Sequence, residues 1–218
     1  MYSQPIICEM LSLADHATAY YYQKHPFSWK HPQPIDLDLL LMLLTGSNIK
    51  MWPLSKDGSV LGMTAHERLT IRMELEDGTV IRDTLLPKDI VVDSSLAGFH
   101  NTGVRNFTLA HEIGHQLLRM RYPYQDLPYQ IEEDFADIIA VGLLLPERLV
   151  RATMALFQFP DTLHYVSRSS LDVNYPRFKD MARHLGVSRR ILAYRMKYLN
   201  ILTSDVPYRH ILPLMEIG

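Results

Sequence analysis

Three things are scarce in this chain of 218 residues: cysteine, long apolar runs and net charge. Cys8 is the only cysteine, so an intrachain disulfide is excluded and a metal site would have to use histidine and carboxylate ligands. The longest apolar runs, residues 39–44 and 138–145, are too short to cross a bilayer. Because the first residues also lack the basic region of a secretory signal, we expect a cytoplasmic protein with no membrane partner.

The charge balance excludes a strongly basic or acidic protein. The chain has 22 Lys and Arg against 24 Asp and Glu, which gives a formal net charge of −2 and favours no class of partner. With 47% hydrophobic and 21% charged residues, it has the composition of a globular enzyme with one substantial core.

The most informative feature present is a pair of histidines separated by three residues. His111 and His115 stand at positions i and i+4, which places both side chains on one face of a helix, and Glu112 follows the first of them. Two imidazoles at this spacing are typical of a zinc site, and the adjacent glutamate is placed to act as a general base.

The alternative is a chance histidine pair on a polar helix surface, and the surrounding sequence argues against it. Asn101 or Thr102 offers an N-cap for a helix that would contain the motif. Apolar residues then recur with helical period, so the helix has a buried face that borders both histidines; these residues are Phe107, Ala110, Ile113, Gly114, Leu117 and Leu118.

A catalytic zinc site usually has three protein ligands, and Glu133 is the best candidate for the third. It lies in a predicted helix over residues 129–145, which Pro146 ends. Asp137, one turn further on, is placed to accept the free N–H of a ligating histidine.

Neighbouring carboxylates leave an alternative open. Glu132, Glu133 and Asp134 could simply complement the positive end of the helix dipole, and Glu132 is the fallback for the third ligand. The dipole does not explain Asp137, because this residue lies in an otherwise apolar run and would be costly to bury without a partner.

Three segments resemble the ImmA/IrrE-type metallopeptidases, which belong to the gluzincin group of zinc peptidases. They are residues 105–118, the stretch from Glu133 to Pro146, and Gly186-Val187-Ser188. The resemblance implies a zincin-like α+β fold and supports Glu133 over Glu132. It also implies a protein substrate, namely a helix-turn-helix repressor in stress response or mobile-element regulation.

The chain departs from the family pattern at two positions beside the motif. Phe135 stands where many relatives have a glutamate, and Arg119 stands where they have a histidine. Neither departure removes a proposed ligand.

The expected chemistry is peptide hydrolysis. Zinc held by His111, His115 and Glu133 would activate a water molecule, and Glu112 would take its proton and pass it to the leaving amine. Manganese is an alternative ion, because imidazole and carboxylate ligands accept several divalent metals. The donor that stabilises the oxyanion stays open among His100, Arg105, Tyr122, Tyr124, Tyr129, His164 and Tyr165.

Before the motif, periodicity predicts helices over residues 12–24 and 35–44. Strands are predicted over residues 69–75 and 79–85, joined by a turn at Asp77-Gly78, and over residues 90–92. This gives a small sheet beside helices, as in zincin-like folds. In such folds an edge strand pairs with the extended substrate, and the sequence does not say which strand forms that edge.

After the motif, a short helix over residues 147–157 and a polar linker over residues 166–170 are predicted. Helices over residues 177–185 and 189–199, with Ser188 as N-cap of the second, would form a helix-turn-helix-like module. We therefore expect a peptidase domain over residues 1–160, this module over residues 171–203 and a tail over residues 204–218.

The basic character of this module suggests a second function. Residues 175–200 carry seven Lys or Arg against one Asp, and Arg189 and Arg190 open the second helix, where such motifs contact bases. The alternative to a zinc endopeptidase is thus a DNA-binding or scaffolding regulator with a vestigial or structural metal site. Glu112 favours the enzyme, because a purely structural site has no use for a base.

Overall fold

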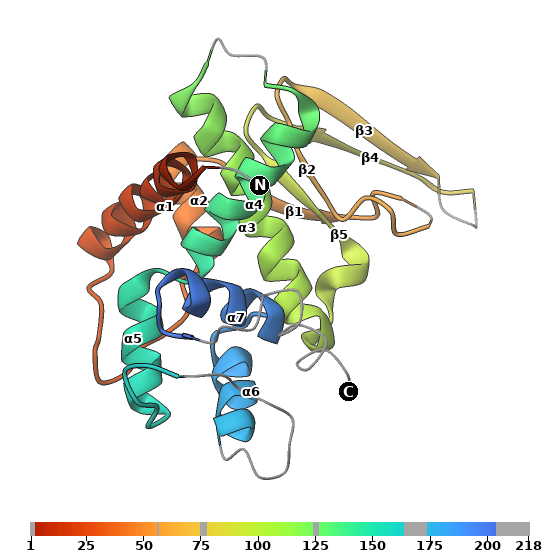
Figure 1. Cartoon of the computed structure of the whole chain (residues 1–218). Coiled ribbons are helices and arrows are strands. Elements are labelled where there is room, and N and C mark those ends of the chain that lie inside the picture. The colour runs from red at the N-terminus through yellow and green to blue at the C-terminus, as the bar shows by residue number, and fades with distance from the viewer. Residues whose placement is uncertain (1–2, 56, 75–77, 124–126, 164–173, 204–218) are drawn as a thin grey trace.

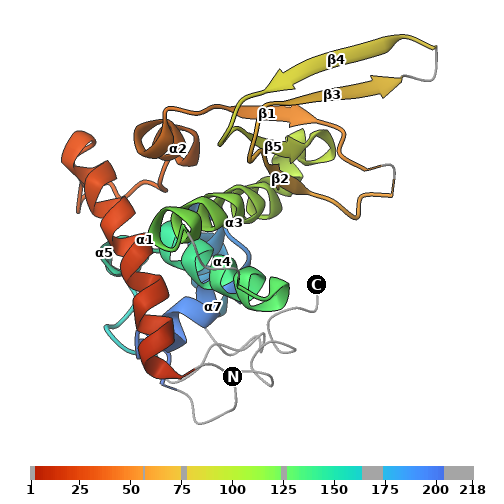
Figure 2. The same ribbon diagram turned by 90° about the horizontal axis from the view of Figure 1, so that it is seen from above.

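The computed structural model describes residues 3–55, 57–74, 78–123, 127–163 and 174–203. Two long helices, α3 (Thr102–Arg121) and α4 (Tyr129–Leu144), cross near the centre of the molecule (Figure 1). A small sheet lies on one side of α3, and α4 lies on the other (Figure 2). The helix that carries the histidine pair is therefore enclosed between two layers.

The sheet beside α3 has three short strands. β5 (Ile90–Asp93) is central, with β1 (Ile49–Trp52) parallel to it and β2 (Gly62–Thr64) antiparallel to it. All residues of β5 are buried, which is why its apolar run could be recognised as a strand from the sequence. β1 and β2, at four and three residues, are too short to show an alternating pattern, and the sequence did not predict them.

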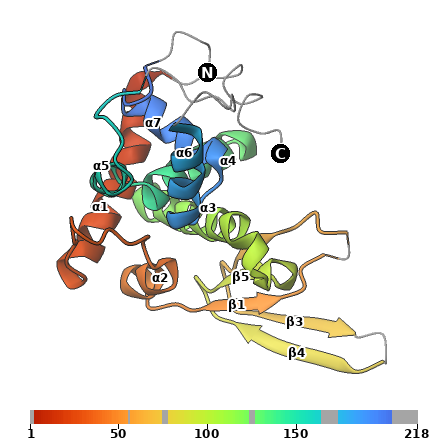
Figure 3. The same ribbon diagram turned by 90° about the horizontal axis from the view of Figure 1, so that it is seen from below.

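The predicted hairpin forms a separate two-stranded sheet. β3 (Leu69–Glu74) pairs antiparallel with β4 (Val80–Leu85). Gly78 has φ +80°, a conformation that glycine adopts without steric cost, while residues 75–77 of the turn lie outside the described part of the chain. The hairpin projects from the end of the molecule opposite α6 (Asn174–His184) and α7 (Arg189–Tyr198) (Figure 3).

The first helix is longer than its sequence suggested. α1 (Gln4–Lys24) begins eight residues before the predicted start at residue 12. The predicted start was wrong: the helix includes Pro5 in its first turn, where proline is well tolerated because the N–H that it lacks would have no partner within the helix. α2 (Leu37–Thr45) starts after Asp36, whose side chain accepts a hydrogen bond from Leu39 N.

The C-terminal helices share the main hydrophobic core. α5 (Glu147–Leu156) follows α4 directly, and α6 and α7 lie near their predicted positions. Arg195 on α7 is 3% exposed and donates a hydrogen bond from Nε to Leu145 O at 2.9 Å. Apolar residues of α6 and α7 belong to the same buried cluster as those of α1 to α4; they include Phe178, Met181, Leu192 and Met196.

Some expected segments lie outside the described residues. The predicted linker over residues 166–170 and the tail over residues 204–218 are among them. Within the described part of the chain, none of the helices combines the length and apolar character needed to cross a membrane.

Gly142 on α4 offers a test of the packing between α1 and α4. A Cβ atom there would lie 2.6 Å from Ala14 Cβ and 3.1 Å from Leu11 Cδ2. Overpacking of a tight core costs about 1–3 kcal/mol, which exceeds the helix-propensity gain of about 1 kcal/mol from Gly→Ala. We therefore expect Gly142→Ala to lower the free energy of unfolding in urea by up to about 2 kcal/mol.

Gly98→Ala is the matched control, because the nearest atom to its added Cβ is 4.0 Å away. It should leave the free energy of unfolding unchanged or slightly increase it. Equal effects of the two substitutions would contradict this account of the α1–α4 contact.

Candidate metal centre

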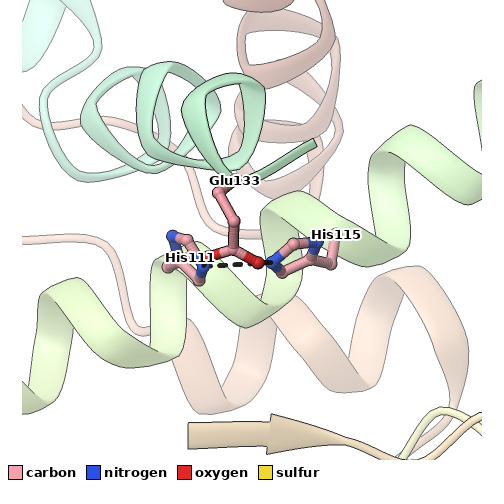
Figure 4. Close-up of side chains that lie close together, drawn as sticks. All are labelled: His111, His115 and Glu133. Carbon is pink, nitrogen blue, oxygen red and sulfur yellow. Dashed lines mark hydrogen bonds and ion pairs between the residues drawn. The ribbon is translucent and has the colours of Figure 1, made fainter. Parts of the chain in front are cut away.

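A close crossing of α3 and α4 places the candidate ligands together. At Gly114 on α3, a Cβ atom would lie 2.9 Å from Ala136 O and 3.1 Å from Ala136 Cα, so only glycine allows this approach. Glu133 lies one turn before Ala136, and its side chain reaches the histidines of α3 (Figure 4). The sequence could show that both helices are amphipathic, but not that they touch at this point.

His111, His115 and Glu133 converge at one point. The two Nε2 atoms of the histidines are 3.0 Å apart. Glu133 Oε2 is 3.3 Å from His111 Nε2, and Glu133 Oε1 is 3.3 Å from His115 Nε2. Ligands bound tetrahedrally at about 2.0–2.1 Å are separated by about 3.3 Å, so these three groups are close enough to hold one small divalent cation.

The other nitrogen of each imidazole contacts a carboxylate. His111 Nδ1 lies 2.8 Å from Asp137 Oδ1. Asp137 is the residue that the sequence pattern predicted as acceptor for the free N–H of a ligating histidine. His115 Nδ1 lies 3.1 Å from Glu132 Oε1. Glu132, the fallback for the third ligand, therefore contacts the far side of a histidine and does not reach the Nε2 pair.

This arrangement fits a divalent cation. If each Nδ1–H donates to its carboxylate, each Nε2 presents a lone pair, and two lone pairs 3.0 Å apart repel unless a cation or a proton lies between them. The four surrounding carboxylates, of Glu112, Glu132, Glu133 and Asp137, also favour positive charge at this point.

Glu112 lies beside the ligands in a tightly enclosed position. It is 8% exposed, and burial raises the pKa of its carboxyl group. The hydroxyl of Thr64 on β2 donates to Glu112 Oε2 at 2.7 Å and partly opposes this increase of the pKa. At Gly62, also on β2, a Cβ atom would lie 2.8 Å from Glu112 Oε1, so the strand packs directly against the carboxylate.

Charge also affects the first histidine. Burial by itself would lower the pKa of His111, but its hydrogen bond to Asp137 and the negative charges of Asp137, Glu112 and Glu133 outweigh this effect and raise the pKa. The same charges stabilise any cation held by this imidazole.

A cavity of about 250 Å³ opens beside two of the candidate ligands, His115 and Glu133. Tyr129 contributes to its lining and is the one residue of the proposed oxyanion donors to do so among those that the structure describes. The full lining consists of Met63, Thr64, His66, Glu112, His115, Arg119, Tyr129, Glu132 and Glu133.

The other oxyanion candidates lie elsewhere or outside the described residues. Arg105 pairs with Asp38 at 3.4 Å, and the Tyr122 hydroxyl donates to Glu9. His100 is exposed in the short helix η2 (Phe99–Asn101) and does not line the cavity. Tyr124, His164 and Tyr165 lie in the segments that are not described.

Sequence reasoning missed His66, Thr64 and Gly62. All three belong to β2 or the residues just after it, a strand too short to be recognised. Burial and the nearby charge of Arg119 lower the pKa of His66, which keeps its imidazole neutral near neutral pH. Only their contact with α3 in space identifies these residues as part of the site.

Comparison with known proteins agrees with this geometry. A family model described as the IrrE N-terminal-like domain, of the M78 peptidases, matches residues 68–197. The match covers more than half of the 218 residues, and the chain belongs to this family, which indicates a metallopeptidase. A search of curated proteins found no match.

Glu133 can be tested as a metal ligand by measuring metal content. We expect about one divalent ion per wild-type chain after incubation with zinc and desalting, and nearly none for Glu133→Ala, because two imidazoles alone bind the ion weakly. Plasma mass spectrometry on identically purified samples measures this difference.

Glu132→Ala and Glu147→Ala serve as comparisons. Glu132→Ala should weaken metal affinity by about 10- to 100-fold, since it removes only the partner of His115 Nδ1. Glu147, which pairs with Arg151 on the exposed side of α5, should have no effect. Loss of metal in Glu132→Ala with retention in Glu133→Ala would reverse the assignment of the two glutamates.

Proposed function

We propose that this protein is a zinc-dependent endopeptidase that hydrolyses a cytoplasmic protein. The observation that carries this proposal is the buried carboxylate of Glu112 next to three converging ligands in a member of a peptidase family. Zinc suits two imidazoles and one carboxylate at these distances, and manganese is the alternative ion.

The residues of this chain can carry out the proton transfers of peptide hydrolysis. When bound, the metal supplies a Lewis acid that polarises the carbonyl and acidifies the attacking water. Glu112 accepts a proton from this water as the water oxygen bonds to the carbonyl carbon. Glu112 then gives that proton to the amide nitrogen as the C–N bond breaks. A raised pKa suits both steps, because the carboxylate must accept and then release the proton.

A purely structural metal site is less compatible with these contacts. Structural zinc sites are usually closed by four protein ligands. Among the residues that the structure describes, the group here consists of three, and it borders a cavity together with a base. This supports an enzyme over a regulator with a vestigial site.

β2 is our candidate for the edge strand that binds the substrate backbone. It is a terminal strand of the described three-stranded sheet, and Met63 and Thr64 line the metal cavity. An edge strand binds extended peptides through its unpaired N–H and C=O groups. Tyr129, His66 and Arg119 line this cavity and could each donate a hydrogen bond to the oxyanion.

The proposed substrate is a helix-turn-helix repressor, on the basis of family resemblance. Direct DNA binding by α6 and α7 is the alternative. Arg189 donates a hydrogen bond to the Tyr175 hydroxyl, and Arg190 lines a cavity with Asp134 and Asp137 of α4. Because Arg189 is engaged by a protein group and the aspartates that share the cavity with Arg190 would repel a phosphate, the peptidase proposal has more support.

Substitution of Glu112 tests the endopeptidase proposal. Glu112→Gln keeps the shape of the side chain but removes the base, so we expect the cleavage rate to fall by at least about 100-fold while bound metal stays near one per chain. N-terminal proteomics of cells expressing either form would identify new protein N-termini that depend on Glu112, with repressors among the cleaved proteins.

Glu9→Gln is a matched control, since Glu9 contacts Tyr122 on the exposed surface. It should produce the same new N-termini as the wild type. Identical N-termini from wild type and Glu112→Gln would rule out the endopeptidase.

Thr64→Val tests the hydrogen bond to Glu112. Loss of this bond removes an interaction that lowers the pKa of Glu112, so the pKa should rise further. Since Glu112 acts as a base only when ionised, activity is lost as pH falls through its pKa, and the acid limb of the kcat/KM profile should move to higher pH. The profile is measured on a substrate identified by proteomics.

Thr18→Val is the control for this substitution, because the Thr18 hydroxyl donates to Asp15 O on α1, away from the site. Its profile should match the wild type. An unchanged acid limb in Thr64→Val would show that Glu112 does not set it.

A further inference from the structure

A second cavity adjoins the metal cavity at the C-terminal end of α3. It has a volume of about 240 Å³ and shares Thr64, His66 and Arg119 with the metal cavity. The rest of its lining comes from Ala65, Pro87, Lys88, Gln116 and Met120. A substrate bound at the metal centre would therefore have this cavity beside its reacting bond.

The two cavities differ in charge. Three glutamates line the metal cavity, whereas none of the described residues that line the second cavity is acidic. Lys88 and Arg119 give the second cavity a positive charge, and His66 adds a neutral imidazole. Such a lining is complementary to a carboxylate.

Lys88 is held at this cavity in an unusual backbone conformation. Its φ of +75° lies in the left-handed region, which disfavours residues with a Cβ atom. Lys88 N donates to Ala65 O at 2.7 Å, and Lys88 O accepts a hydrogen bond from Gln116 Nε2 at 2.8 Å. These bonds hold the backbone of Lys88 against α3 and against the residue that follows β2, so the position of its Cα atom in the lining is fixed.

Arg119 lies between the two cavities. Its Nε is 3.7 Å from Glu132 Oε1, which is too far for a hydrogen bond, and half of its side chain is exposed. The guanidinium therefore keeps donors available for a second carboxylate while it stays close to the metal centre.

We propose that this cavity is a specificity subsite for a carboxylate of the substrate, bound by Lys88 and Arg119 next to the scissile bond. The carboxylate belongs to an Asp or Glu side chain, and the C-terminal carboxylate of a peptide is the other source of the same chemistry. The inference rests on the proposed peptidase function and specifies which peptides the enzyme selects.

Hydroxamates provide a test that does not require a known substrate. One series is N-acetyl-Xaa-hydroxamate and the other is HONH–CO–CH₂–CO–Xaa-NH₂, with Xaa as Glu, Gln or Leu, so that the side chain lies on either side of the metal-binding group. Isothermal titration calorimetry on the zinc-loaded chain compares their affinities. In one series we expect Glu to bind about fivefold or more tightly than its isostere Gln, and the ratio to fall at about 0.5 M salt.

Because Lys88 has a left-handed backbone conformation, its side chain can be removed without loss of stability. Lys88→Gly removes the ammonium group and also relieves the left-handed strain, so the Glu/Gln ratio should approach one while the melting temperature stays the same or rises. Gln158→Gly is the matched control, because Gln158 also has a left-handed φ, +57°, away from both cavities. It should leave the ratio unchanged. Arg119→Gln should also lower the ratio.

The results distinguish a failure of the subsite proposal from a failure of the metal centre. Equal binding of Glu and Gln in both series, while acetohydroxamate still binds the zinc-loaded chain, would overturn the subsite alone. Failure of acetohydroxamate to bind would overturn the metal centre and the subsite with it. If only HONH–CO–CH₂–CO–Leu with a free terminal carboxylate binds better than its amide, the cavity holds a chain terminus, and the side-chain assignment is wrong.

Discussion

The close crossing of α3 and α4 is the contact on which the metal centre depends. At Gly114 the backbone of α4 approaches so closely that any side chain would collide with Ala136. This contact fixes the position of Glu133 relative to His111 and His115. A small shift of either helix would move the three candidate ligands apart. Metal binding would in turn tie the two helices together, because free energy of binding to the folded state adds to its stability.

The sheet contributes the second half of the site. β2 packs against α3 on the side away from α4, where Gly62 and Thr64 confine the carboxylate of Glu112. The candidate metal ligands thus come from a helix pair, and the environment of the proposed base comes from a strand. The same strand leads into Ala65 and His66, which connect the negatively charged metal cavity to the positively charged cavity around Lys88. A short edge strand therefore links the base to the region that we propose selects the substrate.

The C-terminal helices pack against the rest of the chain. Arg195 is buried and bonded to Leu145 O at the end of α4, and apolar residues of α6 and α7 belong to the common core. Burying an arginine is costly unless its donors are satisfied, so this contact fixes α7 in place. The matched family segment likewise continues to residue 197, through both helices.

The sequence by itself determined the parts of this protein that depend on local spacing. The helical period gave α3 and α4, the i, i+4 spacing placed His111 and His115 on one face, and an isolated acid in an apolar run singled out Asp137. Only the tertiary structure decided that Glu132 contacts His115 Nδ1, that Thr64 donates to Glu112, and that Lys88 and His66 line a cavity next to the candidate metal centre. These contacts join residues far apart in the chain through short strands and loops, whose few residues carry no period from which their position could be inferred.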